Sequence, residues 1–161
     1  MARIVLGMGS SHGPMLTTPW QQWDQRVAFD RQTKVHHFQG GQYDFDELVA
    51  LRAGENLAAE ITPDKWERRF TACQTALARM AEVFEAATPD VAVIIGNDQR
   101  EMFTEETIPA FTVYWGETID NRPRTEAQRA VLPPGVAVAE RGHAPPEDAI
   151  YPGHPDFGRH L

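Results

Sequence analysis

The chain has 161 residues, 42% of them hydrophobic and 24% charged, which is typical of one globular domain and argues against a mainly disordered chain. Its 15 Lys and Arg against 23 Asp and Glu give a net charge of −8, which disfavours binding to nucleic acid or to an anionic membrane surface. The single cysteine, Cys73, allows neither an internal disulfide nor a cysteine-based zinc cluster, and no apolar run is long enough to span a membrane.

The N-terminal segment is a short apolar run followed by a turn. Residues 3–8 predict a buried strand, and the Gly-Ser-Ser-His-Gly-Pro sequence after it predicts a loop. Because the run is too short for a signal peptide, we expect a cytoplasmic protein. Residues 18–45 contain Pro19, Gly40, Gly41 and alternating charges, which favour loop or short helix.

Two helices are predicted in the middle of the chain. Residues 44–57 favour a helix with Asp44 as N-cap and Glu47 three residues later, although Gly54 weakens its end. Thr62 as cap and Pro63 in the first turn begin a second helix that ends at Thr88-Pro89. Its apolar residues recur at spacings of three and four on one face: Trp66, Phe70, Cys73, Leu77, Met80 and Phe84. On that face, Cys73 is expected to be an inert buried thiol.

Further strands are predicted after this helix. Residues 91–95 (Val-Ala-Val-Ile-Ile) are typical of a strand buried on both faces, which favours a parallel sheet. Residues 108–115 favour another strand, with Pro109 at its start. We therefore predict an α/β fold with a mainly parallel central sheet flanked by helices and a right-handed crossover. The loops 9–16 and 96–103 would then lie at one sheet edge, where ligand sites gather.

The chain changes character from Asn121 onward, where proline becomes frequent. Only residues 136–138 (Val-Ala-Val) favour a short strand there. Residues 155–161 are typical of the first turn of a helix that is then cut, so we expect an incomplete domain.

Several polar residues are candidates for a site. His12 follows the first predicted strand, and it is either a metal ligand on stiff backbone or a hydrogen-bonding turn residue. Asn97, Asp98 and Gln99 follow the strand 91–95, and they are either ligands at the same edge or an Asx turn.

Other patterns carry less chemistry. The adjacent His36 and His37 would face opposite ways in a strand, and the remaining histidines, His143, His154 and His160, match no metal motif. No complete dinucleotide fingerprint is present, and Ser10 and Ser11 lack a nucleophile elbow.

Two motifs in order resemble a known enzyme family. Residues 4–16 (IVLGMGSSHGPML) resemble the opening of class III extradiol ring-cleavage dioxygenases, the family of the protocatechuate 4,5-dioxygenase catalytic subunit. Residues 89–99 (PDVAVIIGNDQ) resemble the second motif of that family. Residues 45–48 and 56–62 are similar to the gallate and methylgallate dioxygenase branch. The resemblance extends to about Trp115 and implies that residues 1–161 are the N-terminal part of one catalytic domain.

The resemblance implies an iron(II) site of two histidines and one glutamate, with positions left open for a catechol and dioxygen. His12 matches the first histidine ligand, whereas Gln99 stands at the position of the second. No residue matches the glutamate ligand or the base histidine, which in the family come from the C-terminal half, so we expect these 161 residues alone to be inactive.

The function implied is extradiol cleavage of a catecholic or gallate-like phenol in aromatic compound catabolism, in an oligomer or with a second subunit. The alternative is a non-catalytic member or subunit that keeps the fold and has lost the iron. The His12 motif favours the first reading, and Gln99 favours the second.

Overall fold

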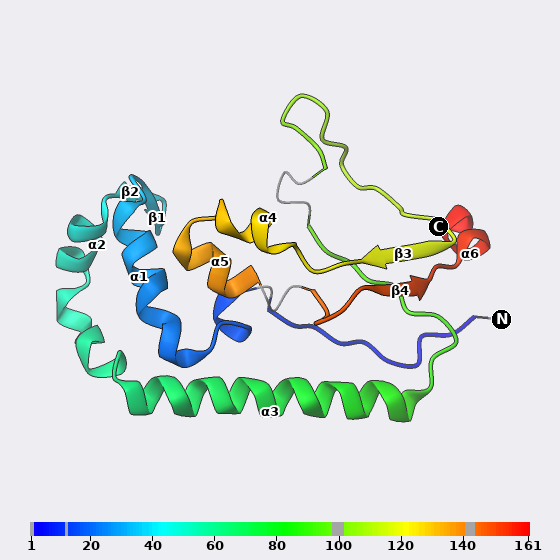
Figure 1. The fold of residues 1–161 in the computed structure, drawn as a ribbon, viewed down its shortest axis with the longest axis horizontal. Helices are drawn as coiled ribbons and strands as arrows, with labels where there is room; N and C mark the ends of the chain where they lie inside the picture. The colour runs from blue at the N-terminus through cyan, green and yellow to red at the C-terminus, as the bar shows by residue number, and fades with distance from the viewer. Residues whose placement is uncertain (1, 12, 98–101, 141–143) are drawn as a thin grey trace.

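The computed structural model describes residues 2–11, 13–97, 102–140 and 144–161. It combines helices with two small antiparallel strand pairs (Figure 1). No helix in these ranges is both long and apolar enough to cross a membrane. In chain order the elements are η1 (Pro14–Leu16), η2 (Trp20–Gln22), α1 (Trp23–Gln32), β1 (His36–Phe38), β2 (Gly41–Tyr43), α2 (Phe45–Leu51), η3 (Ala53–Glu55), η4 (Leu57–Glu60), α3 (Pro63–Ala87), β3 (Thr118–Asn121), α4 (Glu126–Ala130), α5 (Pro134–Glu140), β4 (Ala149–Pro152) and α6 (Pro155–His160).

The long helix α3 confirms the predicted helix. Pro63 occupies its first turn, and Thr88 ends it in the left-handed region with φ 43°. Thr62 stands at the N-cap position, but its side chain makes no capping hydrogen bond, so that detail of the prediction is wrong. Five members of the predicted apolar stripe are half-buried, namely Trp66, Phe70, Cys73, Leu77 and Met80. The sixth, Phe84, stays 40% exposed because the last turns of α3 extend past α1 and α5 (Figure 1).

The segment before α3 contains more regular structure than its sequence predicts. Where loop or short helix was expected, residues 18–45 form the ten-residue helix α1 and the hairpin β1–β2. Gln39 and Gly40 connect the two strands with φ values of 48° and 81°. A tight hairpin turn requires positive φ at both central residues. This turn therefore allows strands to form in a segment whose polar sequence favours a loop.

The helix predicted from Asp44 is confirmed at its start and is shorter than expected. The Asp44 side chain accepts from the Glu47 amide at 2.8 Å, and the Glu47 carboxylate accepts from the Asp44 amide at 2.9 Å. This is the predicted capping box. The helix α2 ends at Leu51 and not near residue 57, because Arg52 leaves the helical region with φ −98° and ψ 11°. The chain continues as η3, which ends where Asn56 turns left-handed with φ 51°.

The predicted parallel central sheet is not supported. Residues 3–8, 91–95 and 108–115 carry no strand assignment, and both sheets of the described residues are antiparallel pairs. Residues 136–138 lie in α5 instead of a strand, since Pro133-Pro134 favours a helix start. The mixture of helix and strand agrees with an α/β composition, without the predicted topology.

The physical reason for the missing sheet is the lack of a second covering layer. Parallel strands require cover on both faces. Leu6 is half-buried near α3, but Ile94 and Ile95 are 87% and 92% exposed. The segments 2–11 and 88–97 do cross the molecule in the same direction, opposite to α3, as a βαβ unit would require (Figure 1).

The tightest packing lies among α1, α5 and the start of α3. Thr18, Ala139 and Trp23 are buried here, at 2%, 4% and 9% exposure, and Gly135 is buried as well. The Trp23 ring stacks at a tilt on Trp66, with centroids 6.0 Å apart. This small cluster joins the N-terminal segment to the long helix.

A second unit is built on the β3–β4 pair, in which Thr118 lies opposite Pro152 and Asn121 opposite Ala149. The predicted C-terminal helical turn is confirmed as α6. The Arg159 guanidinium lies 4.4 Å from the centroid of the Trp115 ring, which attaches α6 to the segment before β3.

Gly135 is the point of closest approach between α1 and α5. A Cβ placed there would lie 2.9 Å from the Phe29 Cβ and 3.0 Å from the Gln25 carbonyl oxygen. Since backbone cannot move aside, the clash of a Gly135→Ala variant, about 1–3 kcal/mol, should exceed the helix propensity gain of about 1 kcal/mol. We expect Gly135→Ala to lower the free energy of unfolding in urea. The control Gly54→Ala has open space around its Cβ and should be neutral. Equal effects of the two changes would contradict the packing described.

Candidate functional site

The two predicted metal ligands, His12 and Gln99, lie outside the described residues. Asp98 and His143 do as well. The structure therefore bears on the segments around positions 12 and 99 and not on the ligand side chains. Residues 2–11 lead to position 12, and residues 88–97 lead to position 99.

The turn that directly follows position 12 is tied to three different elements. The Thr17 hydroxyl donates to the Ala139 carbonyl of α5 at 3.2 Å. The Trp23 indole N–H of α1 donates to the Thr18 carbonyl at 2.9 Å. From α3, the Gln74 amide donates to the Leu16 carbonyl at 2.7 Å. Residues 13–18 consequently have a fixed backbone, which is what a ligand-bearing loop needs.

Hydrogen bonds inside this turn stabilise it further. The buried Thr18 hydroxyl donates to the Pro14 carbonyl at 2.8 Å, and the Gly13 amide donates to Ser11 Oγ at 3.0 Å. Both are local interactions of the kind that hydroxyl side chains make in turns.

The segment before position 12 lies along α3. A shallow groove between them is lined by residues 6–9 and by Arg79, Met80 and Val83. Gly7 and Gly9 have open space where a side chain would be. Asn97 and the five residues before it are exposed, and so are residues 2–11 apart from the half-buried Leu6. The two segments thus share a direction, and most of each is exposed.

Among the histidines that the structure describes, His36 and His154 make local hydrogen bonds. His36 Nε2 lies 2.9 Å from the Asp30 carbonyl oxygen, and the exposed His37 stands beside it in β1. His154 Nδ1 accepts from the Phe157 amide at 3.3 Å, and it caps α6. His160 is the last residue of α6.

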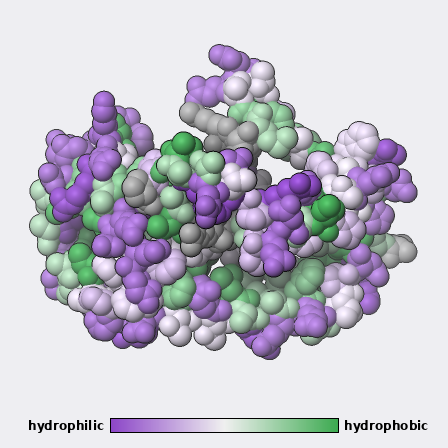
Figure 2. Space-filling view, in the orientation of Figure 1, coloured by the Kyte–Doolittle hydropathy of each residue, from purple (hydrophilic) through white to green (hydrophobic). Residues whose placement is uncertain are grey.

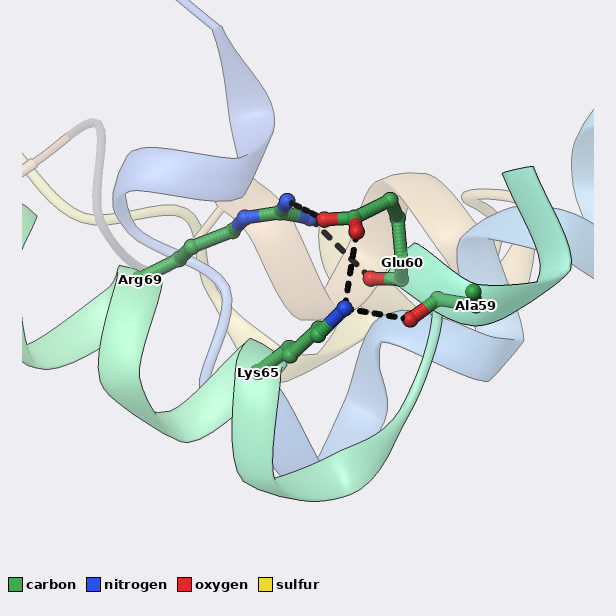
Figure 3. A network of polar contacts seen from close by, with 4 residues as sticks. All are labelled: Ala59, Glu60, Lys65 and Arg69. Carbon is green, nitrogen blue, oxygen red and sulfur yellow. Dashed lines mark hydrogen bonds and ion pairs between the residues drawn. The ribbon is translucent and has the colours of Figure 1, made fainter. Parts of the chain in front are cut away.

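A polar network fixes the start of α3 against η4 (Figure 3). Lys65 Nζ donates to the Ala59 carbonyl at 2.6 Å and to the Glu60 carboxylate at 2.7 Å. Arg69 donates to the Glu60 carbonyl at 3.1 Å and also pairs with the Glu60 carboxylate. The hydrogen bond and charge of Lys65, with a further contribution from Arg69, hold the pKa of the Glu60 carboxyl below its usual range.

Across the ranges that the structure describes, no three His, Cys, Asp or Glu side chains are grouped as metal ligands. No family model, curated protein or solved structure matches the sequence.

Sequence reasoning missed the residues that tie the turn down. Thr17 and Thr18 carry a weak local signal, since hydroxyl residues before Pro19 are typical of a turn. Gln74 carries none, because its partner Leu16 is 58 positions away.

The Thr18 hydroxyl is a test of this turn. Thr18→Val keeps the side-chain shape but removes the donor to the Pro14 carbonyl, so we expect a loss of about 1 kcal/mol in the free energy of unfolding. The matched control is Thr75→Val, an exposed position on α3 whose hydroxyl also donates four residues back, to Thr71 at 2.9 Å. It should change stability by less than about 0.5 kcal/mol. Similar losses at both positions would show that burial of Thr18 adds nothing.

The lowered pKa of Glu60 predicts a pH dependence. Its carboxylate stabilises the fold above the unfolded pKa of about 4.3, and this contribution is lost as pH falls through the lower folded value. Glu60→Gln should therefore lower the melting temperature at pH 7, and the difference from wild type should shrink below about pH 4. Glu67→Gln, at an exposed position on α3, is the control. A Glu60→Gln deficit that stays constant with pH would contradict a charge-based network.

Proposed function

We propose that this chain is part of a cytoplasmic, iron(II)-dependent extradiol dioxygenase that cleaves the ring of a catecholic or gallate-like phenol with dioxygen. The observation that carries the proposal is the pair of motifs at residues 4–16 and 89–99, found in the order of the class III family. The common direction of the segments 2–11 and 88–97 supports it, because both lead toward the proposed ligand positions from the same side. Two segments that run in the same direction can end on the same side of the molecule without being paired as strands.

The donors that these residues offer do not complete an iron site. The proposed ligands are one imidazole, from His12, and one amide oxygen, from Gln99. A facial triad takes two imidazoles and a carboxylate, and an amide oxygen is a weaker ligand than an imidazole. We therefore assign no catalytic step to the described residues. The role proposed for this chain is to bring His12 to the metal on a backbone supported by residues 13–18.

A second candidate function rests on Gln99. Glutamine at the position of the second histidine favours a non-catalytic member or subunit that keeps the fold without the iron. The two candidates differ in what His12 does, since only the first requires it to bind metal.

Iron binding by the 161-residue chain separates them. Anaerobic iron(II) titration should show weak binding to the wild type and weaker binding to His12→Ala. Gln99→His should raise the affinity roughly tenfold or more by adding an imidazole, and His12→Ala in that background should remove the gain. His37→Ala, an exposed histidine of β1, is the control and should change nothing. Circular dichroism of each variant checks the fold.

The results against the proposal are specific. Equal iron binding by wild type and His12→Ala, with no gain in Gln99→His, would leave the non-catalytic reading. Oxygen uptake with a panel of catechols should show no ring cleavage by the 161 residues, because a carboxylate ligand and a base have no match here. Ring-opened product above a free-iron control would contradict that expectation.

A further inference from the structure

The segment 91–97 is uncharged, apolar and open to solvent. Its sequence, Val-Ala-Val-Ile-Ile-Gly-Asn, contains no ionisable side chain. Val93, Ile94 and Ile95 are 57%, 87% and 92% exposed. Figure 2 shows hydrophobic atoms at the surface between α3 and the β3–β4 pair, the region that this segment and residues 2–11 cross in Figure 1. Three consecutive large apolar residues at such exposure are uncommon on a monomer surface.

The surface of the whole chain is larger than a compact monomer requires. The accessible area is 13087 Å², whereas a compact chain of 18.1 kDa exposes roughly 8,100 Å². The excess of roughly 5,000 Å² is ample for an obligate dimer, whose interfaces bury roughly 2,000–5,000 Å² in total. The area does not identify the partner, but the excess is large enough for an interface with a second copy.

The backbone of this segment is also free to pair. Within the part of the chain that the structure describes, no backbone hydrogen bond involves residues 91–97. Val and Ile favour strands, and an unpaired strand is a template for another one. Since each chain carries a net charge of −8, two copies repel each other except where they meet at uncharged surface.

We propose that residues 91–95 of this segment form a strand that pairs antiparallel with the same strand of a second copy around a two-fold axis. One such contact gives backbone partners to both copies at once. It also brings together an uncharged stretch of each chain and covers Ile94 and Ile95. A register centred on Val93 places Val91 opposite Ile95 of the second copy and Val93 opposite itself. This inference is independent of the proposed enzymatic function.

Cysteine cross-linking tests the register. In a Cys73→Ala background, which removes the one native thiol, Val93→Cys should form a disulfide-linked dimer on mild oxidation, because paired antiparallel residues lie within disulfide range. The matched control is Val131→Cys, an 82% exposed apolar residue outside the segment. We expect at least about tenfold more linked dimer from Val93→Cys at equal concentration. Equal linkage at the two positions would overturn the proposal.

Charge insertion tests the energetics. Ile94→Lys should weaken dimerisation by about tenfold or more in sedimentation equilibrium, because it buries an unpaired ammonium, whereas Val131→Lys should leave it unchanged. If Ile94→Lys fails to fold, as judged by circular dichroism, the cross-linking result decides alone. A wild-type chain that is monomeric at every concentration overturns the proposal. In that case, amide exchange protection of residues 91–97 would show that the chain itself covers the segment.

Discussion

The half-buried stripe of α3 is the interaction on which the rest of the structure depends. Trp66 meets Trp23 of α1 at one end, and Gln74, about one turn beyond Phe70, donates to the Leu16 carbonyl. At 1.5 Å per residue, the 25 residues of this helix extend for about 38 Å. The segments that pack on it are shorter, so its support ends before the helix does. Phe84 is exposed for that reason, and the long axis of the molecule follows this helix (Figure 1).

Local signals predicted the start of α2 and the whole of α3 because their causes are local. The capping box of α2 needs only Asp44 and Glu47, and the stripe of α3 follows from spacing alone. The strand predictions were wrong because burial of an apolar run depends on partners elsewhere. Val91 to Ile95 has the composition of a buried strand, yet residues 92–95 are exposed in the part of the chain that the structure describes. Residues 136–138 are apolar and β-branched in part, but the two prolines before them start a helix.

The candidate site, like the fold, could be predicted from the sequence only in part. The motif residues could be identified from sequence order and resemblance, and the two ligand candidates remain predictions. The restraints on the turn 13–18 could not be foreseen, because they come from three separate elements. Ala139 accepts a hydrogen bond from a hydroxyl 122 positions earlier, and no local pattern encodes such a contact. The fixed turn after position 12 is a tertiary property, established only when α1, α3 and α5 are in place.

The two sheets differ greatly in the length of chain that closes them. Two residues, Gln39 and Gly40, join β1 to β2, whereas residues 122–148 separate β3 from β4. Closing the longer loop costs about 2 kcal/mol more in chain entropy than closing the shorter one. The longer closure is helped by Arg122, whose guanidinium lies 2.7 Å from Asp120 and 3.8 Å from Asp148 across the join. A single proteolytic cut within residues 122–148 would turn β3–β4 pairing into an association between two separate polypeptides, while the hairpin would be unaffected. Resistance to protease cleavage within residues 122–148 therefore measures whether the unit built on the β3–β4 pair is assembled.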